Sequence, residues 1–182
     1  MQPCRTAPDA AAPEAAQATF AAASFASVLI AQSVAQTPAC PPTATLDQLI
    51  VALDNAVSGF ADQDRTCLRD VMLPDARLMP VAKAADGNFA PRILTVDGWI
   101  DAVRKRGHTA FYEHQVKVAT ETYGHEAHLW STYELRDTPD GKPEVRGINS
   151  IQAVFDGHRW RVISILWQAE TPAEPIPEKY LP

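Results

Sequence analysis

The chain has 182 residues, of which 46% are hydrophobic and 21% are charged, and its formal net charge is −6. This is the composition of a globular protein with one domain and additional segments. The negative charge argues against binding to nucleic acid, which needs a clustered basic surface, and against binding to an anionic membrane surface.

Residues 1–43 differ in composition from the rest, because Ala and Pro dominate them. An apolar run over residues 20–31 precedes the small-residue pattern Ser33-Val34-Ala35, which is typical of a secretory signal. The run is too short to span a membrane. However, the residues before it carry two acidic groups against one arginine, so a disordered leader is the alternative. A secretory signal predicts a periplasmic or secreted protein, whereas a disordered leader predicts a cytoplasmic one.

Three cysteines are spread over the chain. Cys4 lies in the leader, whereas Cys40 and Cys67 lie after the predicted cleavage pattern. An exported protein can form a disulfide between the last two. Because they have no CxxC spacing, two isolated thiols are the simpler interpretation.

Helical patterns occur between residues 45 and 107, in a segment that begins the folded domain predicted over 44–170. Thr45 is the predicted N-cap of a first helix whose apolar residues recur at helical spacing up to Phe60. A short helix capped at Asp62 or Asp64 follows, and we expect Pro74 to stop it. A strand over 76–82 and a turn at Asp86-Gly87 come next. Thr95 then caps an amphipathic helix that ends at Gly107.

After Gly107 the hydrophobic period changes from 3.6 to 2, which predicts four strands at 111–122, 126–137, 144–156 and 158–168. Asp156-Gly157 is the strongest hairpin signal, since Asp-Gly suits a two-residue turn. Residues 171–182 contain four prolines and form an extended tail. Helices followed by an antiparallel meander predict an α+β domain with helices packed on one face of a bent sheet.

Three segments together resemble the NTF2-like superfamily, in its SnoaL-like and DUF4440-like branch. They are "AVSGFADQDRTCLRDVMLPDARLM", "GHEAHLWSTYELRD" and "RGINSIQAVFDGHRWRVISILWQ". The resemblance covers residues 44–170 and implies a cone built from N-terminal helices and a curved antiparallel β-sheet. It also implies a homodimer through the outer sheet face. It implies no single activity, because such domains include cyclases, isomerases, dehydratases and pure binding domains.

Alternation along the predicted strands assigns side chains to the two faces of the sheet. In the second long strand, Leu129, Ser131 and Tyr133 share one face. In the last strand, Trp160 and Trp167 are seven residues apart, so we expect them on opposite faces.

His114 is the best candidate for a general base, because a carboxylate, Glu113, is next to it in the sequence. Adjacent strand residues point to opposite faces, so only one of the two can reach a shared pocket. Tyr133 and Asn149 are expected to hold a developing enolate oxygen. For each residue, a surface position or ordinary packing is the alternative.

Four further residues are candidates for binding a ligand in the cone: Trp99, Asn149, Trp167 and Arg146. The arginine is a candidate for holding an acidic group, and an ion pair with Glu134 or Glu144 is the alternative. The segment His125-Glu126-Ala127-His128 does not have metalloprotease spacing, and its two histidines point to opposite faces of a strand. No metal and no cofactor are therefore expected.

Three functions remain open. The first is binding of a small apolar or aromatic ligand in the cone. The second is a cofactor-free cyclase, isomerase or dehydratase that uses His114 as its base. The third is a dimeric interaction module that uses the sheet face carrying Trp130 and Trp160.

Overall fold

The computed structural model describes residues 39–182, and the predicted secretory signal lies outside these residues. The helices are α1 (Leu46–Val57), α2 (Thr66–Val71) and α3 (Val96–Arg104), followed near the C-terminus by the 3-10 helix η1 (Glu178–Tyr180). The strands are β1 (Gly59–Phe60), β2 (Met72–Lys83), β3 (Phe89–Pro91), β4 (Ala110–Tyr123), β5 (Glu126–Arg136), β6 (Val145–Phe155) and β7 (Trp160–Ala169). No helix in this part of the chain is long and apolar enough to cross a membrane.

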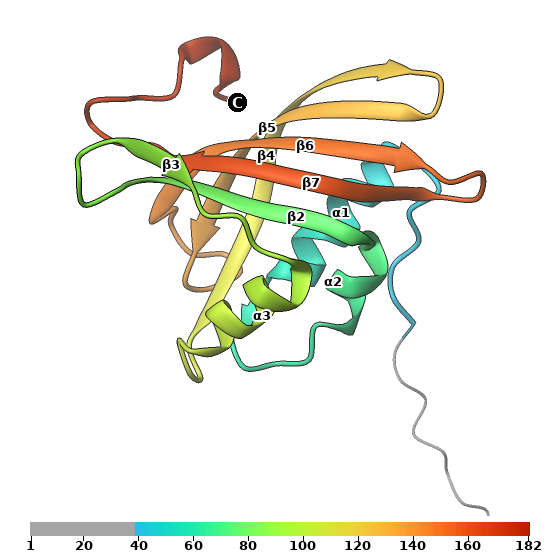
Figure 1. The fold of residues 1–182 in the computed structure, drawn as a ribbon, viewed down its shortest axis with the longest axis horizontal. Helices are drawn as coiled ribbons and strands as arrows, with labels where there is room; N and C mark the ends of the chain where they lie inside the picture. The colour runs from blue at the N-terminus through green and yellow to red at the C-terminus, as the bar shows by residue number, and fades with distance from the viewer. Residues whose placement is uncertain (1–38) are drawn as a thin grey trace, which may run out of the picture. The chain divides into compact units, whose positions relative to one another are not determined.

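The strands form one seven-stranded sheet in the order β1-β4-β5-β6-β7-β2-β3. The meander β4 to β7 is antiparallel, as the sequence predicts, but β2 joins the sheet parallel to β7. The three α-helices lie on one side of the strongly bent sheet, and the C-terminal segment lies on the other (Figure 1). The predicted α+β architecture is confirmed.

The helices begin largely where local chemistry predicts. The Thr45 hydroxyl accepts a hydrogen bond from Gln48 N at 3.2 Å, and the Gln48 side chain accepts one from Thr45 N, which makes a capping box. Thr95 caps α3 in a similar way through Gly98 N. The end of α1 differs from the prediction, because the chain leaves the helix at Ser58 and Gly59 continues with a φ of +100° into β1.

The predictions for α2 are wrong at both ends. Its N-cap is Arg65 rather than an aspartate, although the Asp64 carboxylate does accept hydrogen bonds from the backbone and hydroxyl of Thr66. The helix ends at Val71, and β2 runs straight through Pro74. Pairing with β7 starts at Met72, so the long-range contact ends the helix before the proline is reached.

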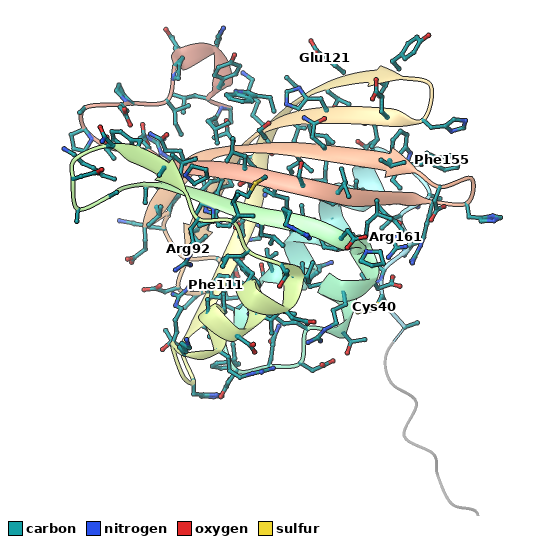
Figure 2. All side chains as sticks on the ribbon, viewed as in Figure 1. Cys40, Arg92, Phe111, Glu121, Phe155 and Arg161 are labelled. Atoms are coloured by element: carbon teal, nitrogen blue, oxygen red, sulfur yellow. A yellow bond between two sulfur atoms is a disulfide. The ribbon has the colours of Figure 1, made fainter. Side chains whose placement is uncertain are left out.

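The hydrophobic core fills the space between the helices and the concave face of the sheet. It contains Leu49 and Leu53 of α1, Leu129 of β5, Ile151 of β6 and Val162 of β7, all nearly inaccessible to solvent. Phe111 of β4 also lies on this side of the sheet, near α3 (Figure 2). We call this concave face the inner face and the opposite one the outer face.

A β-bulge in β7 changes which residues face inward. Gln152 pairs with Ser164 but Ala153 pairs with Val162, so Ile163 is an extra residue in the strand. Trp160 and Trp167 consequently both pack against the same core. The prediction that they lie on opposite faces is wrong, because simple alternation assumes an uninterrupted ladder.

A second bulge interrupts β4 between Gln115 and Lys117. Before it, odd-numbered residues such as Phe111 and Glu113 face inward. After it, Val118 packs on the core while Lys117 reaches Leu181 O on the outer side.

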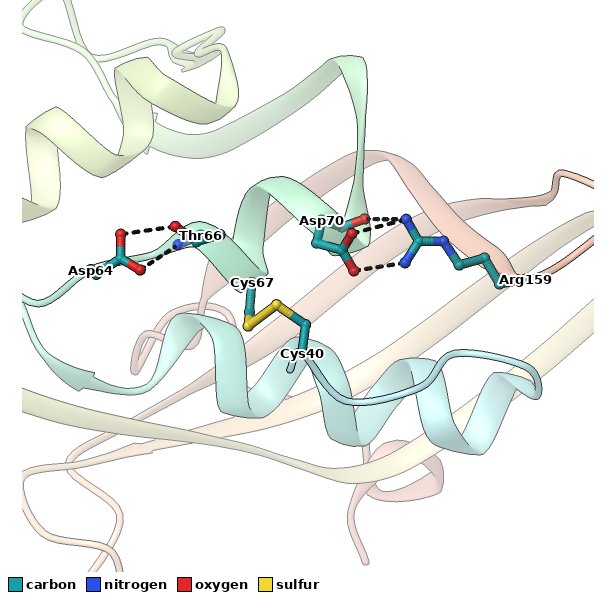
Figure 3. Close-up of a disulfide and its surroundings, with 6 residues drawn as sticks. All are labelled: Cys40, Asp64, Thr66, Cys67, Asp70 and Arg159. Atoms are coloured by element: carbon teal, nitrogen blue, oxygen red, sulfur yellow. Dashed lines mark hydrogen bonds and ion pairs between the residues drawn. A yellow bond between two sulfur atoms is a disulfide. The ribbon is translucent and has the colours of Figure 1, made fainter. Parts of the chain in front are cut away.

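Cys40 and Cys67 form a disulfide that joins the segment before α1 to α2 (Figure 3). The prediction of two isolated thiols is therefore wrong. The bridge closes a loop with a sequence separation of 27, for which chain entropy gives a stabilisation of about 3–4 kcal/mol. On the same helix, Asp70 makes a two-pronged ion pair with Arg159 at 2.7 and 3.0 Å, which ties α2 to the β6–β7 loop (Figure 3).

The C-terminal tail crosses the outer face of the sheet. Thr132 Oγ1 donates to Tyr180 O at 2.6 Å, the Tyr180 ring packs on Trp130, and Ile176 is only 8% exposed. The predicted extended tail is therefore anchored, and it includes the turn of η1. Because the tail covers part of the outer face, apolar residues occur on both faces of the sheet.

Candidate functional site

A cavity of about 180 Å³ opens between the helices and the inner face of the sheet. This is smaller than the roughly 300–1,000 Å³ of sites for drug-sized molecules, so it suits a small ligand. Its walls are mostly apolar and include Trp99, Phe111 and Trp167, with a few polar side chains among them. The full lining is Leu53, Val57, Leu78, Trp99, Val103, Arg106, Phe111, Glu113, Tyr133, Leu135, Asn149, Ile165 and Trp167.

Glu113 places a carboxyl group in this cavity. Its backbone N–H donates to the Ser58 hydroxyl at 2.9 Å, so the end of α1 fixes this part of β4. Its Oε1 accepts hydrogen bonds from Asn149 Nδ2 at 3.1 Å and from Gln115 Nε2 at 2.8 Å. The other oxygen, Oε2, has no such partner among residues 39–182 and is not sealed from solvent. The carboxyl group is thus held at one oxygen and free at the other.

The surroundings of Glu113 favour its protonated form. Burial raises the pKa of Glu113 to about 7, and the negative charge of Asp54 adds to the rise. The hydrogen bonds from Asn149 and Gln115 act in the opposite direction but are outweighed. A carboxyl group with a pKa near neutrality can both accept and return a proton under ordinary conditions.

Asp54 of α1 lies behind this group at the edge of β4. Its Oδ2 accepts a hydrogen bond from Gln115 N at 3.0 Å, next to the bulge that interrupts the strand. Burial raises the pKa of Asp54 to about 6. Asp54 does not line the cavity, so it acts on the site through its charge rather than by contact.

Gln115 organises the polar groups around Glu113. Its side-chain oxygen accepts hydrogen bonds from the Ser131 hydroxyl and from Asn149 Nδ2, the latter at 3.3 Å. The amide nitrogen of Asn149 therefore uses both of its hydrogens on neighbouring side chains, Glu113 and Gln115. Asn149 positions the carboxyl group and has no N–H left to hold an enolate oxygen, which corrects that prediction.

Tyr133 adds a phenol to the same wall. Burial raises its pKa above the ordinary range, and the charge of Glu113 adds to the effect, so the hydroxyl stays protonated and can donate a hydrogen bond. Gly147 makes room for the ring, because a Cβ there would come within 2.5 Å of the Tyr133 hydroxyl oxygen. The hydroxyl has no hydrogen-bond partner within residues 39–182 and is not sealed from solvent.

Solved structures show which fold this cone belongs to. An NTF2-like protein of unknown function from Shewanella baltica is 15% identical, with a TM-score of 0.48, over 69% of this chain and 94% of that one. The beta subunit of a proposed aromatic-ring-hydroxylating dioxygenase from Novosphingobium aromaticivorans is 15% identical, with a TM-score of 0.51, over 69% of this chain and 87% of that one. The chain has the NTF2-like fold.

The NTF2-like fold is the one that the resemblance to SnoaL-like domains predicted, and that prediction is confirmed. At such low identity the similarity concerns the fold alone. No family model matches the sequence. No curated protein matches it either.

The structure places the predicted site residues in different parts of the NTF2-like cone. Trp99, Tyr133, Asn149 and Trp167 line the cavity. Arg146 does not, because it belongs to the outward-facing set of β6 and pairs with Glu170 at 2.9 Å. The predicted role of Arg146 in holding a ligand is therefore wrong for this cavity.

His114 is not part of the cavity lining and points away from the face that carries Glu113. Its Nε2 is buried and has no hydrogen-bond partner among the described residues. The sequence showed that only one residue of the pair could reach the pocket, and the structure selects Glu113. The signal for this choice was the parity that Glu113 shares with the apolar Phe111.

The histidines considered for metal binding are engaged elsewhere. His125 stacks on Phe155, and His128 Nε2 lies 3.2 Å from the Ser150 hydroxyl. Among residues 39–182, no group of three or more His, Cys, Asp or Glu side chains is arranged to hold a metal ion.

Proposed function

We propose that the cone binds a small, largely apolar carbonyl compound and that Glu113 moves a proton on it. The single observation that carries this proposal is the Glu113 carboxyl group. One of its oxygens is held by two amides, the other is free at an apolar cavity, and its pKa is about 7.

The proposed step is proton abstraction from a carbon next to a carbonyl group. Glu113 Oε2 takes the proton, and the electron pair of the C–H bond moves onto the carbonyl oxygen. The protonated Tyr133 hydroxyl donates a hydrogen bond to that oxygen as its charge develops. Return of this proton to another carbon completes an isomerisation. If the Glu113 carboxyl group first exchanges its proton with solvent, return to the same carbon completes an isotope exchange, and neither reaction needs a cofactor.

Deuterium exchange tests this proposal. Phenylacetone, a small neutral ketone, is incubated with the protein in D₂O, and loss of its benzylic proton signal is followed by NMR. We expect exchange above the buffer rate, rising with pH through about 7 as Glu113 loses its proton. Glu113→Gln should reduce the enzyme-dependent rate by at least about 100-fold, which is the usual contribution of a general base.

His114→Gln is the matched control, because it alters the adjacent residue on the opposite face. It should leave the exchange rate within about twofold of that of the unaltered protein. Equal rates for Glu113→Gln and the unaltered protein would contradict the proposal, and so would exchange that depends on His114.

Ligand binding without turnover is the second candidate function, and the mostly apolar wall of the cavity favours it. Trp99 and Trp167 lie on that wall and would pack against a flat ligand. Under this alternative, phenylacetone raises the melting temperature of the protein but shows no enzyme-dependent exchange.

We also propose that the protein is exported. The disulfide supports this, because such bonds persist in oxidising compartments. N-terminal sequencing of the mature protein from fractionated cells checks it, with cleavage after Ala35 as the expected result. An intact N-terminus on protein recovered from the cytoplasm would contradict export.

A homodimer through the outer face remains a further proposal. The tail already covers Trp130 in this region, so a partner would have to contact the tail as well as the sheet. Light scattering on the unaltered protein and on Trp130→Glu tests it. A mass of two chains that falls to one in the variant supports the dimer, and an unchanged mass counts against it.

A further inference from the structure

The cavity lining includes a cationic side chain that the proposed proton transfer does not use. Arg106 lines the cavity and is exposed, and its guanidinium carbon lies 4.7 Å from the centre of the Phe111 ring. The guanidinium carbon of Arg65 lies 5.3 Å from the same ring centre and 5.4 Å from that of Trp99. Two cations therefore lie against the aromatic wall.

The charge of Arg65 is buried without a neutralising carboxylate. The residue is 2% exposed, and its guanidinium donates to the carbonyl oxygens of Ala56, Val57 and Phe60 at 2.7–3.2 Å. Ala56 and Val57 are the last residues of α1, where a cation is also favoured by the helix dipole, and Phe60 belongs to β1. No carboxylate within residues 39–182 lies within ion-pair distance of Arg65, and its Nε has no partner.

The positive charges of Arg65 and Arg106 interact with each other. Burial lowers the pKa of Arg65, and the charge of Arg106 lowers it further, so the two guanidinium groups repel each other. An anion placed at Arg106 would relieve that repulsion. Interactions of this kind are stronger beside a low-dielectric wall than in bulk water.

Glu113 is not the missing anion. Among residues 39–182 it forms no ion pair with Arg65 or Arg106. The cavity lining therefore contains two separate polar groups, a carboxyl group held by amides and an exposed guanidinium on an aromatic ring. A ligand that satisfies both needs an anionic group at one end and an acidic carbon at the other.

We propose that the cavity selects a small aromatic carboxylate, with its carboxylate on Arg106 and its ring against Trp99 and Phe111. Guanidinium and carboxylate can form two parallel hydrogen bonds, which suits this orientation. This proposal specifies the ligand of the site described above. Its binding part is independent of the proposed function, and only the proton-transfer step rests on it. Phenylpyruvate combines the three required parts: a carboxylate, an aromatic ring and a benzylic carbon next to a carbonyl group.

Binding is tested apart from chemistry with phenylacetate and its neutral counterpart phenylacetamide, measured by titration calorimetry on the full chain. We expect the protein to bind phenylacetate more tightly. Arg106→Gln should weaken phenylacetate binding about tenfold or more, the usual effect of losing a charge-assisted hydrogen bond, and leave phenylacetamide binding within about twofold. Lys105→Gln is the matched control. It removes one positive charge from the residue next to Arg106, and the Lys105 side chain is not part of the cavity lining.

Equal affinity for the two compounds, no binding of either, or equal loss in Arg106→Gln and Lys105→Gln would overturn the anion proposal. Failure of the proposed function has a different signature. In that case Glu113→Gln binds phenylacetate as the unaltered protein does and exchanges the benzylic proton of phenylpyruvate at the same rate. If both proposals hold, Arg106→Gln slows phenylpyruvate exchange by a larger factor than it slows phenylacetone exchange.

Discussion

Both faces of the sheet carry polar and aromatic residues, but the two faces use them differently. On the outer face, Thr132 and Trp130 contact the C-terminal tail, and the Thr132 hydroxyl donates its hydrogen to Tyr180 O. On the inner face, Glu113 and Tyr133 each keep an oxygen that faces a cavity. Polar side chains therefore indicate a functional site in this sheet only where their hydrogen bonds are incomplete and a ligand can reach them.

The largest expected effect comes from filling the space beside Tyr133. In Gly147→Val, the new side chain would collide with the Tyr133 ring and with the backbone of Gln168. We expect a loss of about 3 kcal/mol in the free energy of unfolding, at the upper end for overpacking, and loss of proton exchange. Ile148→Ala, at the next position on the outer face, is the comparison in urea unfolding and should keep exchange. Unchanged stability in Gly147→Val would show that the two side chains do not share this space.

The second effect concerns the pH dependence of stability. Between pH about 4.5 and about 7 the folded chain keeps a proton on Glu113 that the unfolded chain releases, so this group makes stability fall as pH rises. Glu113→Gln removes the titration and should be more stable than the unaltered protein by about 2–3 kcal/mol at pH 8, with a much smaller difference at pH 4.5. Urea unfolding at the two pH values measures this. A difference that does not change with pH would contradict the raised pKa.

A third effect tests the outer face. Ile176 is the buried anchor of the tail, and Ile176→Ala should cost about 2 kcal/mol, at the low end for a buried aliphatic residue because the tail can lift locally. Proteolysis should then cut within residues 171–182 faster than in the unaltered protein. Phenylacetone exchange should stay within about twofold. Loss of exchange would show that the two faces are coupled.

The smallest effect isolates one hydrogen bond. Thr132→Val keeps the shape of the side chain but removes the bond to Tyr180 O, and we expect a loss of about 1 kcal/mol. Amide hydrogen exchange should report faster exchange in η1 and no change in β4. A changed rate of amide hydrogen exchange at Glu113 in β4 would show that the two faces are not independent.

The sequence by itself determined those features that depend on neighbouring residues. The caps at Thr45 and Thr95 are made by side chains that bond within their own first turn. The β6–β7 hairpin forms where Asp156-Gly157 predicts it, although its loop extends to Arg159 because Asp156 Oδ1 accepts from both His158 N and Arg159 N. The α+β class followed from the order of helical and strand patterns, whereas the cone itself was implied by the resemblance to NTF2-like domains.

Only the tertiary structure decided which side chains meet. Each bulge adds one residue to a strand and so reverses the faces beyond it, which no period-2 pattern reveals, and this is why Trp160 and Trp167 share a core. The hydrogen bond that Asn149 donates to Glu113 joins residues 36 positions apart in the chain, which no local pattern predicts. The raised pKa of Glu113 likewise exists only because folding removes its carboxyl group from water and brings Asp54 near it.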